Sequence, residues 1–152
     1  MVTSGDNPIF IDTNILVYAN IPAYPLHQLA LQTIQSLIDA EVELWLSRQV
    51  LREFIVSVTR PQTYANPQPI ELVVERVQFF ENQFRIAEDS PQVIARLLEL
   101  LQQVPTGGRQ VHDANIVATM LTVGVNRLLT HNTEDFERFA EFITVLPLVI
   151  TP

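Results

Sequence analysis

The chain has 152 residues, of which 47% are hydrophobic, so its length suits one compact domain with a substantial core. It contains no cysteine, which excludes disulfides, thiolate metal sites and a cysteine nucleophile. All nine basic residues are arginine, and the net charge of -8 argues against a protein that holds nucleic acid through a general basic surface. The apolar runs are shorter than the roughly 20 residues of a membrane span, and the opening MVTSGDNP lacks signal-peptide features, so we expect a soluble cytoplasmic protein that binds no membrane.

Strands and helices are expected to alternate along the chain. The stretch PIFID, residues 8–12, is typical of a buried strand. Further strands are predicted over 42–47, 84–88, 127–131 and 143–150, and helices over 14–19, 26–39, 48–60, 69–82, 91–103 and 112–123. This alternation indicates parallel crossover units. The predicted fold class is therefore α/β, a three-layer α/β/α domain with a central, mostly parallel sheet over residues 1–152.

Local signals mark several element boundaries. Ser47 is a natural N-cap, and Ser90-Pro91 opens a helix. The proline-rich segment 60–69 is expected to be a loop, and residues 106–108 a flexible turn. The helix over 69–82 carries an apolar face that serves either the core or an interface, formed by Leu72, Val73, Val77, Phe79 and Phe80.

Asp12 interrupts an otherwise apolar stretch, PIFIDTNILVYA, and stands at the end of the predicted first strand. Open parallel sheets bind ligands beyond the carboxyl ends of their strands, so this position suits a functional site. A strand-end aspartate is also a common N-cap for the helix that follows. The position of Asp12 alone does not distinguish a functional role from a capping role.

Asp113 lies in VHDANIVATMLTVG, on the stripe of the predicted helix that also carries Ile116 and Val117. An ionised side chain that points toward the core is costly unless it is paired or binds a metal. Helix capping is the alternative role, but a cap does not need to point inward, which favours a functional role. The adjacent His112 should point about 100° away and is expected to be a structural or surface residue.

Glu53 and the run from Asn132 to Asp135 are weaker signals. Glu53 sits at the flank of an apolar helical arc, where a solvated glutamate is the ordinary case. The Asn132–Asp135 run follows a strand that ends at Thr130, and it fits a capping turn as well as a functional site. Thr130 and Asn132 nevertheless fall, like Asp12, at carboxyl ends of predicted parallel strands, so we expect them at one edge of the sheet.

Three stretches together resemble a known family. IDTNILVYA, VLREFIVSVTRP and HDANIVATMLTVGVNRLLTHNTEDF are similar in order and spacing to the motifs of PIN-domain ribonucleases, specifically the VapC toxins of bacterial type II toxin-antitoxin pairs. The resemblance covers residues 9–148, with the proline-rich segment 61–69 as a departure. It implies an acidic quartet of Asp12, Glu53, Asp113 and Asp135, with Glu134 as the alternative fourth acid. It also implies supporting polar positions at Thr13, Asn14, Thr130 and Asn132.

The resemblance further implies a metal-dependent endoribonuclease that hydrolyses RNA phosphodiester bonds. Converging carboxylates raise each other's pKa values unless cations occupy the site, and Mg²⁺ or Mn²⁺ suits such an oxygen-rich pocket. Asp12 and Asp113 would be the principal ligands, with Glu53 and Asp135 contributing directly or through water. A metal-bound water of lowered pKa would attack the phosphate and leave a 5′-phosphate and a 3′-hydroxyl.

The same resemblance implies the partners. The substrate would be RNA, with arginines near the cleft, for instance Arg48, Arg52 or Arg60, adding phosphate contacts. A small antitoxin protein would cover the cleft, and a homodimer is typical of the family.

Other α/β classes fit the residues less well. Phosphoacceptor proteins, such as two-component receivers and haloacid dehalogenase phosphatases, normally pair a lysine with the phosphoryl group, and this chain has none. The phosphatase pattern also needs an aspartate where Asn14 stands. No Gly-x-x-x-x-Gly-Lys element is present, which excludes a P-loop nucleotidase. The alternative that stays open is a catalytically inert PIN-like domain that binds RNA or protein.

Overall fold

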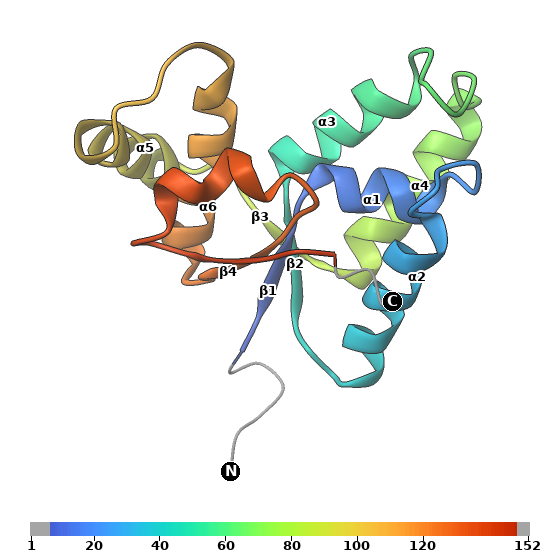
Figure 1. Cartoon of the computed structure of the whole chain (residues 1–152), viewed down its shortest axis with the longest axis horizontal. Coiled ribbons are helices and arrows are strands. Elements are labelled where there is room, and N and C mark those ends of the chain that lie inside the picture. Colours follow the sequence, from blue (N-terminus) through green and yellow to red (C-terminus); the bar gives the residue numbers. More distant parts are fainter. Residues whose placement is uncertain (1–6, 149–152) are drawn as a thin grey trace.

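The computed structural model describes residues 7–148 (Figure 1). Its strands are β1 (Ile9–Ile11), β2 (Leu44–Ser47), β3 (Arg85–Ala87), β4 (Arg127–Leu129) and β5 (Thr144–Leu146). Its α-helices are α1 (Thr13–Asn20), α2 (His27–Asp39), α3 (Arg48–Val58), α4 (Ile70–Gln83), α5 (Pro91–Gln103) and α6 (Val111–Val123). Two 3₁₀ helices, η2 (Gly108–Gln110) and η3 (Thr133–Phe139), precede α6 and β5.

The five strands form one parallel sheet in the order β3-β2-β1-β4-β5. From β1 the chain moves outward through β2 to β3, and then returns to place β4 on the other side of β1. The direction of winding therefore reverses between β1 and β4. Ligand sites in open parallel sheets form at such a reversal, beyond the carboxyl ends of the strands.

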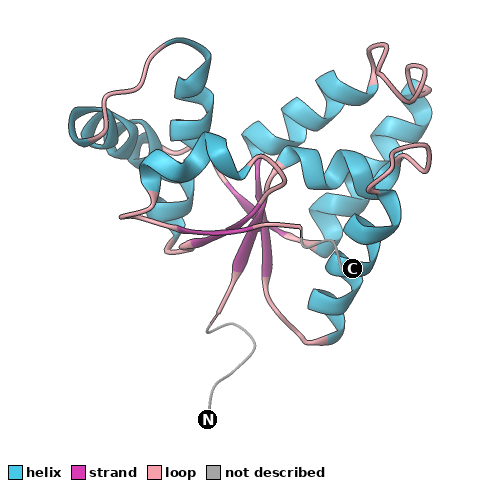
Figure 2. Cartoon of the chain, viewed as in Figure 1, coloured by secondary structure: helices cyan, strands magenta, loops and turns pink. Residues whose placement is uncertain are grey.

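The helices cover both faces of the sheet, in three layers (Figures 1 and 2). Helices α1 to α4 lie on one side of the strands, and α5 and α6 lie together on the other. Right-handed crossovers explain this division, because connections that run in opposite directions along a sheet place their helices on opposite faces. The predicted three-layer α/β/α class is confirmed.

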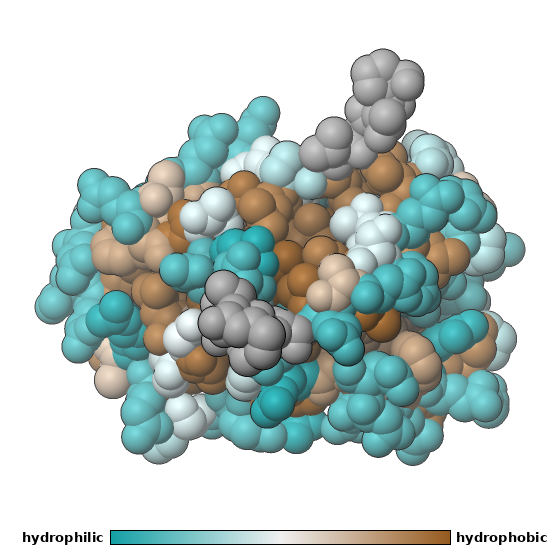
Figure 3. Space-filling model, turned by 90° about the horizontal axis from the view of Figure 1, so that it is seen from below, coloured by the Kyte–Doolittle hydropathy of each residue, from teal (hydrophilic) through white to brown (hydrophobic). Residues whose placement is uncertain are grey.

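The central strands are buried on both faces. Phe10, Ile11, Leu46 and Leu128 are fully inaccessible to solvent, as expected for strands between two helical layers. Figure 3 looks at the molecule from below the view of Figure 1, toward the end where β1 begins, and shows apolar surface among hydrophilic side chains. The carboxyl ends of the strands lie on the opposite side, where β1 leads into α1.

The predicted elements are present, with boundaries shifted by at most two residues except in the last strand. The strand predicted over 8–12 ends at Ile11, so Asp12 is the N-cap of α1 and lies one residue beyond the strand. The turn predicted at residues 106–108 continues into η2, with Gly108 at a positive φ of 62°. The last predicted strand is shorter, and its residues 149 and 150 lie outside the described residues.

The apolar face of α4 divides between core and surface. Val73 and Phe80 are buried, and Phe80 packs edge-on against Phe54 of α3 with ring centroids 5.1 Å apart. Leu72 and Val77 are half-buried, whereas Phe79 is 51% exposed. The core interpretation therefore holds for the inner part of this face. Within residues 7–148, none of the helices has the length and apolar character that crossing a membrane requires.

Helix α3 begins with a buried cap, which generates the first prediction. The Ser47 hydroxyl accepts a hydrogen bond from the Val50 N–H at 3.1 Å, and Ser47 is fully buried. Ser47→Ala should therefore lower the free energy of unfolding by about 1 kcal/mol in urea denaturation. Ser90→Ala is the matched control, because Ser90 caps α5 without a side-chain hydrogen bond. An equal loss in both variants would contradict the assigned role of the Ser47 cap.

Candidate active site

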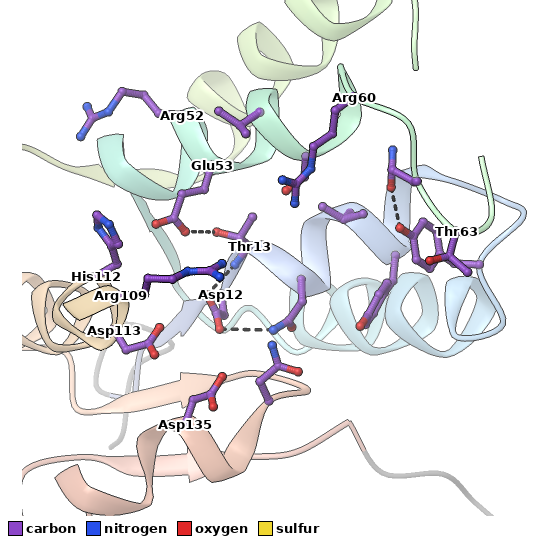
Figure 4. A pocket seen from close by; sticks show the side chains of 18 of the residues that line it. Asp12, Thr13, Arg52, Glu53, Arg60, Thr63, Arg109, His112, Asp113 and Asp135 are labelled. Atoms are coloured by element: carbon purple, nitrogen blue, oxygen red, sulfur yellow. Dashed lines mark hydrogen bonds between the residues drawn. The ribbon is translucent and has the colours of Figure 1, made fainter. Parts of the chain in front are cut away.

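A pocket of about 1050 Å³ opens at the carboxyl ends of the strands, at the point where the winding reverses. Four carboxylates line it: Asp12 after β1, Glu53 of α3, Asp113 of α6 and Asp135 of η3 (Figure 4). These acids come from both helical layers and from both sides of the reversal point. The strand order thus brings together residues up to 123 positions apart in the sequence.

Asp12 is the most buried of the four, with 7% of its surface exposed. One carboxylate oxygen, Oδ1, accepts a hydrogen bond at 2.7 Å from the N–H of Thr13, the first residue of α1, for which Asp12 is the N-cap. The other oxygen, Oδ2, accepts from the Thr130 hydroxyl at 2.8 Å and from the Asn14 amide at 3.3 Å. Capping and membership of the pocket are therefore compatible roles for Asp12.

The supporting residues connect the ends of β1 and β4. The Asn14 amide also donates to the Thr130 hydroxyl at 3.2 Å, and its carbonyl oxygen accepts from the His131 N–H at 3.0 Å. The Thr130 hydroxyl accepts in addition from the Asn132 N–H at 3.1 Å. Asn14 and Thr130 thereby fix the Asp12 carboxylate, while the Asn132 side chain lines the pocket.

Glu53 is held from two directions. Its Oε2 atom accepts from the Thr13 hydroxyl at 2.9 Å, and its Oε1 atom accepts from the Gln49 amide at 2.9 Å. The Gln49 amide also donates to the His112 carbonyl at 2.9 Å, and its own carbonyl oxygen accepts from Asn115 at 2.7 Å. Gln49 therefore ties Glu53 of α3 to the first turns of α6.

Asp113 and Asp135 border the pocket opposite Glu53 (Figure 4). Asp113 lies in the first turn of α6 and is half-buried, whereas Asp135 lies in the first turn of η3 and is exposed. Asp113 is not the helix cap, because the N-cap position is Gln110. Of the two neighbouring acids in η3, Asp135 lines the pocket and Glu134 does not.

Burial and mutual repulsion make the pocket acids weaker acids. The pKa of Asp12 is raised to about 6, chiefly because the side chain is buried; hydrogen bonds from Thr130 and Thr13 oppose the increase, and the charges of Glu53 and Asp135 add to it. The pKa of Asp113 is also about 6, again chiefly because of burial and then because of the other three carboxylates.

The donor set suits a divalent cation that keeps part of its water shell. Within residues 7–148, no three acidic or histidine side chains stand close enough together to bind a metal ion through protein ligands alone. Mg²⁺, however, is usually bound through one or two carboxylates and several waters. A buried Asp12 with a raised pKa beside a second such acid, Asp113, fits this mode of binding.

Three arginines line the same pocket: Arg52, Arg60 and Arg109. Arg52 pairs with Asp89 at 3.2 Å, whereas Arg60 and Arg109 form no ion pair with any residue between 7 and 148. In Figure 4, Arg60 and Arg109 point into the pocket from opposite sides. Arg48, the other arginine expected near the cleft, does not line the pocket.

Arg48 is instead held on the surface of the molecule. Its guanidinium pairs with Glu81 of α4 and with Glu88 after β3, both at 2.8 Å. Arg109, Gln49 and Tyr18 are pocket or supporting residues that sequence reasoning missed. Spacing signals existed for Tyr18, which follows Asn14 by four residues, and for Gln49, which precedes Glu53 by four, so that each shares a helix face with an expected site residue.

Solved structures share the fold of this chain at low sequence identity. VapC20 of Mycobacterium tuberculosis, a toxin that cleaves the sarcin-ricin loop, is 18% identical with a TM-score of 0.65, and the match covers 91% of this chain and 99% of that one. VapBC2 of Rickettsia felis, bound to a DNA fragment from its promoter, is 20% identical with a TM-score of 0.66, over 91% and 97% of the two chains. VapBC-1 of Haemophilus influenzae is 19% identical with a TM-score of 0.62, over 92% and 97%.

The sequence itself matches a family model. No curated protein matches the chain. The model of the PIN domain matches residues 9–142, which include all four acids of the pocket and every strand except β5. The chain therefore belongs to the PIN domain family.

Proposed function

We propose that this protein is a metal-dependent endoribonuclease that acts as the toxin of a toxin-antitoxin pair. The observation that carries the proposal is the convergence of Asp12, Glu53, Asp113 and Asp135 on one pocket at the reversal point of a PIN fold. The structural likeness to a sarcin-ricin loop cleaving toxin supports RNA as the substrate. Unpaired nucleotides of a structured RNA are the usual targets of sequence-selective RNA recognition.

Asp12 and Asp113 would hold Mg²⁺ or Mn²⁺, with Glu53 and Asp135 contributing ligands directly or through water. When bound, such an ion supplies Lewis-acid stabilisation of the phosphate and a water of lowered pKa. Hydrogen bonds from Thr13 and Gln49 orient the Glu53 carboxylate toward the same space. Glu53 would accept a proton from the attacking water, and the products would carry a 5′-phosphate and a 3′-hydroxyl.

The arginines would bind the phosphates of the strand. Arg60 and Arg109 line the pocket without ion-pair partners in the described part of the chain, so their guanidinium groups are available to phosphate oxygens. Asn132 lines the same space and would orient a phosphate or a carboxylate.

A small antitoxin protein would cover this pocket and keep the enzyme inactive in the cytoplasm. The support is the likeness to chains from toxin-antitoxin complexes of Haemophilus influenzae and Klebsiella pneumoniae. A homodimer is proposed on the same family grounds.

The proposal predicts the behaviour of the acidic variants. Purified protein free of antitoxin should cut total cellular RNA into discrete fragments in Mn²⁺ or Mg²⁺, and not in EDTA. Asp113→Asn should lower the rate by at least about a hundredfold, because it removes one of the two principal ligand charges while no hydrogen bond of Asp113 is lost. Gel analysis of the fragments measures both effects. Equal cleavage by Asp113→Asn and the parent would refute the site, and no cleavage by folded parent would favour an inert binding module.

The identity of the fourth acid is tested by a neighbouring pair of variants. Asp135→Asn should lower the cleavage rate about tenfold or more, since Asp135 lines the pocket and interacts electrostatically with Asp12 and Asp113. Glu134→Gln should leave the rate within about twofold, because Glu134 is exposed outside the pocket. The reverse ranking of the two rates would assign the fourth acid to Glu134.

The raised pKa of Asp113 predicts how stability depends on pH in the metal-free protein. Its pKa is about 6 in the folded protein and near 3.8 when the environment does not perturb it, so the folded state binds the proton more tightly. The contribution of Asp113 to the free energy of unfolding should therefore fall as the pH rises from about 4 to 6. In EDTA at pH 7.5, Asp113→Asn should be more stable than the parent by about 1 kcal/mol, a value reduced for the solvent screening of a half-buried group.

Thermal unfolding in EDTA at several pH values measures this effect. A gain of about 1 kcal/mol corresponds to roughly 2–4 °C in Tm at pH 7.5, and the gain should vanish toward pH 4. Glu134→Gln is the control for loss of an exposed charge. A gain in Tm that is independent of pH would show that the Asp113 charge is not its source.

A further inference from the structure

The pocket is larger than a site for one metal ion and one phosphate group needs to be. A water molecule occupies about 30 Å³ in the liquid, so a hydrated cation fills a small part of a volume of about 1050 Å³. The rest of the pocket extends away from the acids between α1 and α3. Its walls therefore indicate what else it accommodates.

One wall is a continuous face of α1. Thr13, Asn14, Val17 and Tyr18 all line the pocket, and their spacing places them on one side of that helix. The other wall comes from α3 and the residues after it, where Glu53, Val56, Ser57 and Arg60 lie at helical spacing. Arg60 follows Glu53 by seven residues, which corresponds to about 10 Å at the rise of a helix, so this wall runs well past the acidic end of the pocket.

The far end of the pocket is aromatic. Tyr18 and Tyr24 line it, with ring centroids 5.2 Å apart, and Tyr64 packs edge-on against Tyr24 at 5.1 Å. His131 packs edge-on against the other side of Tyr18 at 5.6 Å. The three tyrosines are the only ones in the chain. Tyr18 and Tyr24 remain partly exposed, so parts of their rings are accessible from the pocket.

The same end contains a polar group without a partner. The Gln62 carbonyl oxygen accepts a hydrogen bond from the Tyr24 hydroxyl, which fixes the side-chain amide at the pocket wall. Its Nε2 atom is buried and has no hydrogen-bond partner among residues 7–148. A buried amide donor without a partner destabilises the free protein, and an acceptor on a bound ligand would remove that cost. Arg60 lines the same pocket and forms no ion pair within residues 7–148.

We propose that Tyr18, Tyr24 and Gln62 form a subsite for an unpaired nucleobase of the RNA, next to the phosphodiester bond at the acidic end. This inference rests on the proposed ribonuclease function and adds to it the residues that recognise the substrate. Aromatic rings stack on bases, and a glutamine amide hydrogen-bonds to base edges. Arg60, between the two ends, would bind the phosphate that connects the held nucleotide to the cleaved bond.

Binding of a base-free strand tests the subsite directly. Fluorescence anisotropy would compare a labelled RNA of about ten nucleotides with a ribose-phosphate strand of equal length that lacks bases. CaCl₂ would neutralise the acids, and gels would verify that the strands stay intact. The parent should bind the RNA about tenfold more tightly than the base-free strand, within the range of about 1–3 kcal/mol measured for stacking of one base.

Matched variants assign the difference to the subsite. Tyr18→Leu should bind both strands almost equally, and Tyr18→Phe should retain the preference because the ring remains. Gln62→Ala should lose part of the preference. Phe79→Leu is the control, because Phe79 is a 51% exposed aromatic residue on α4 that does not line the pocket. Circular dichroism would show that each variant is folded.

The outcomes separate this subsite from the proposed function. Equal binding of both strands by the parent would overturn the subsite, and so would a preference that Tyr18→Leu retains to the same degree as Phe79→Leu. RNA cleavage in Mn²⁺, measured in parallel, reports on the ribonuclease alone. A preference that depends on Tyr18 would support the base subsite even in a parent that does not cleave.

Discussion

The arrangement of this pocket depends on one buried carboxylate. Asp12 stands where β1 passes into α1, with only 7% of its surface exposed. A buried ionised group costs several kcal/mol unless hydrogen bonds compensate for lost water. Thr13, Asn14 and Thr130 supply three donors, but burial still dominates, since the pKa remains at about 6. The protein thus tolerates a partly compensated charge at the reversal point of its sheet, a feature typical of functional sites.

Hydrogen bonds extend from this carboxylate across the top of the sheet. Thr130 connects it to β4, and Thr13 connects α1 to Glu53 on α3. Gln49 then connects Glu53 to the start of α6, next to Asp113. The network therefore joins the two helical layers and holds side chains from separate elements around one space. Its members are buried or half-buried side chains that are already hydrogen-bonded, so they lose little further freedom when a ligand binds.

The parts of the site that depend on neighbouring residues could be predicted from the sequence, whereas the parts that depend on distant residues could not. The position of Asp12 beside the end of β1, the inward stripe of α6 and the cap at Ser47 follow from local patterns, although Asp12 lies one residue beyond the strand. The role of Gln49 depends on contacts 63 and 66 residues away, for which the helical pattern of α3 contains no signal. Arg48 was expected near the cleft, but its partners Glu81 and Glu88 lie 33 and 40 residues later and hold it on the surface. Local periodicity indicates which face is buried, and only the tertiary fold decides which polar residues meet.

The charge of the pocket explains how a protein with a net charge of -8 can act on a polyanion. Four carboxylates and three arginines line the pocket, so in the metal-free protein their formal charges leave a small negative excess. A single divalent cation would reverse the sign of that excess, and bound cations are often the largest local charges in such sites. Under the proposed function, phosphate binding therefore depends on metal binding, and a general basic surface is unnecessary. Arg60 and Arg109 point into the pocket from opposite sides, so under the same proposal they would attract the phosphates of the strand from both walls.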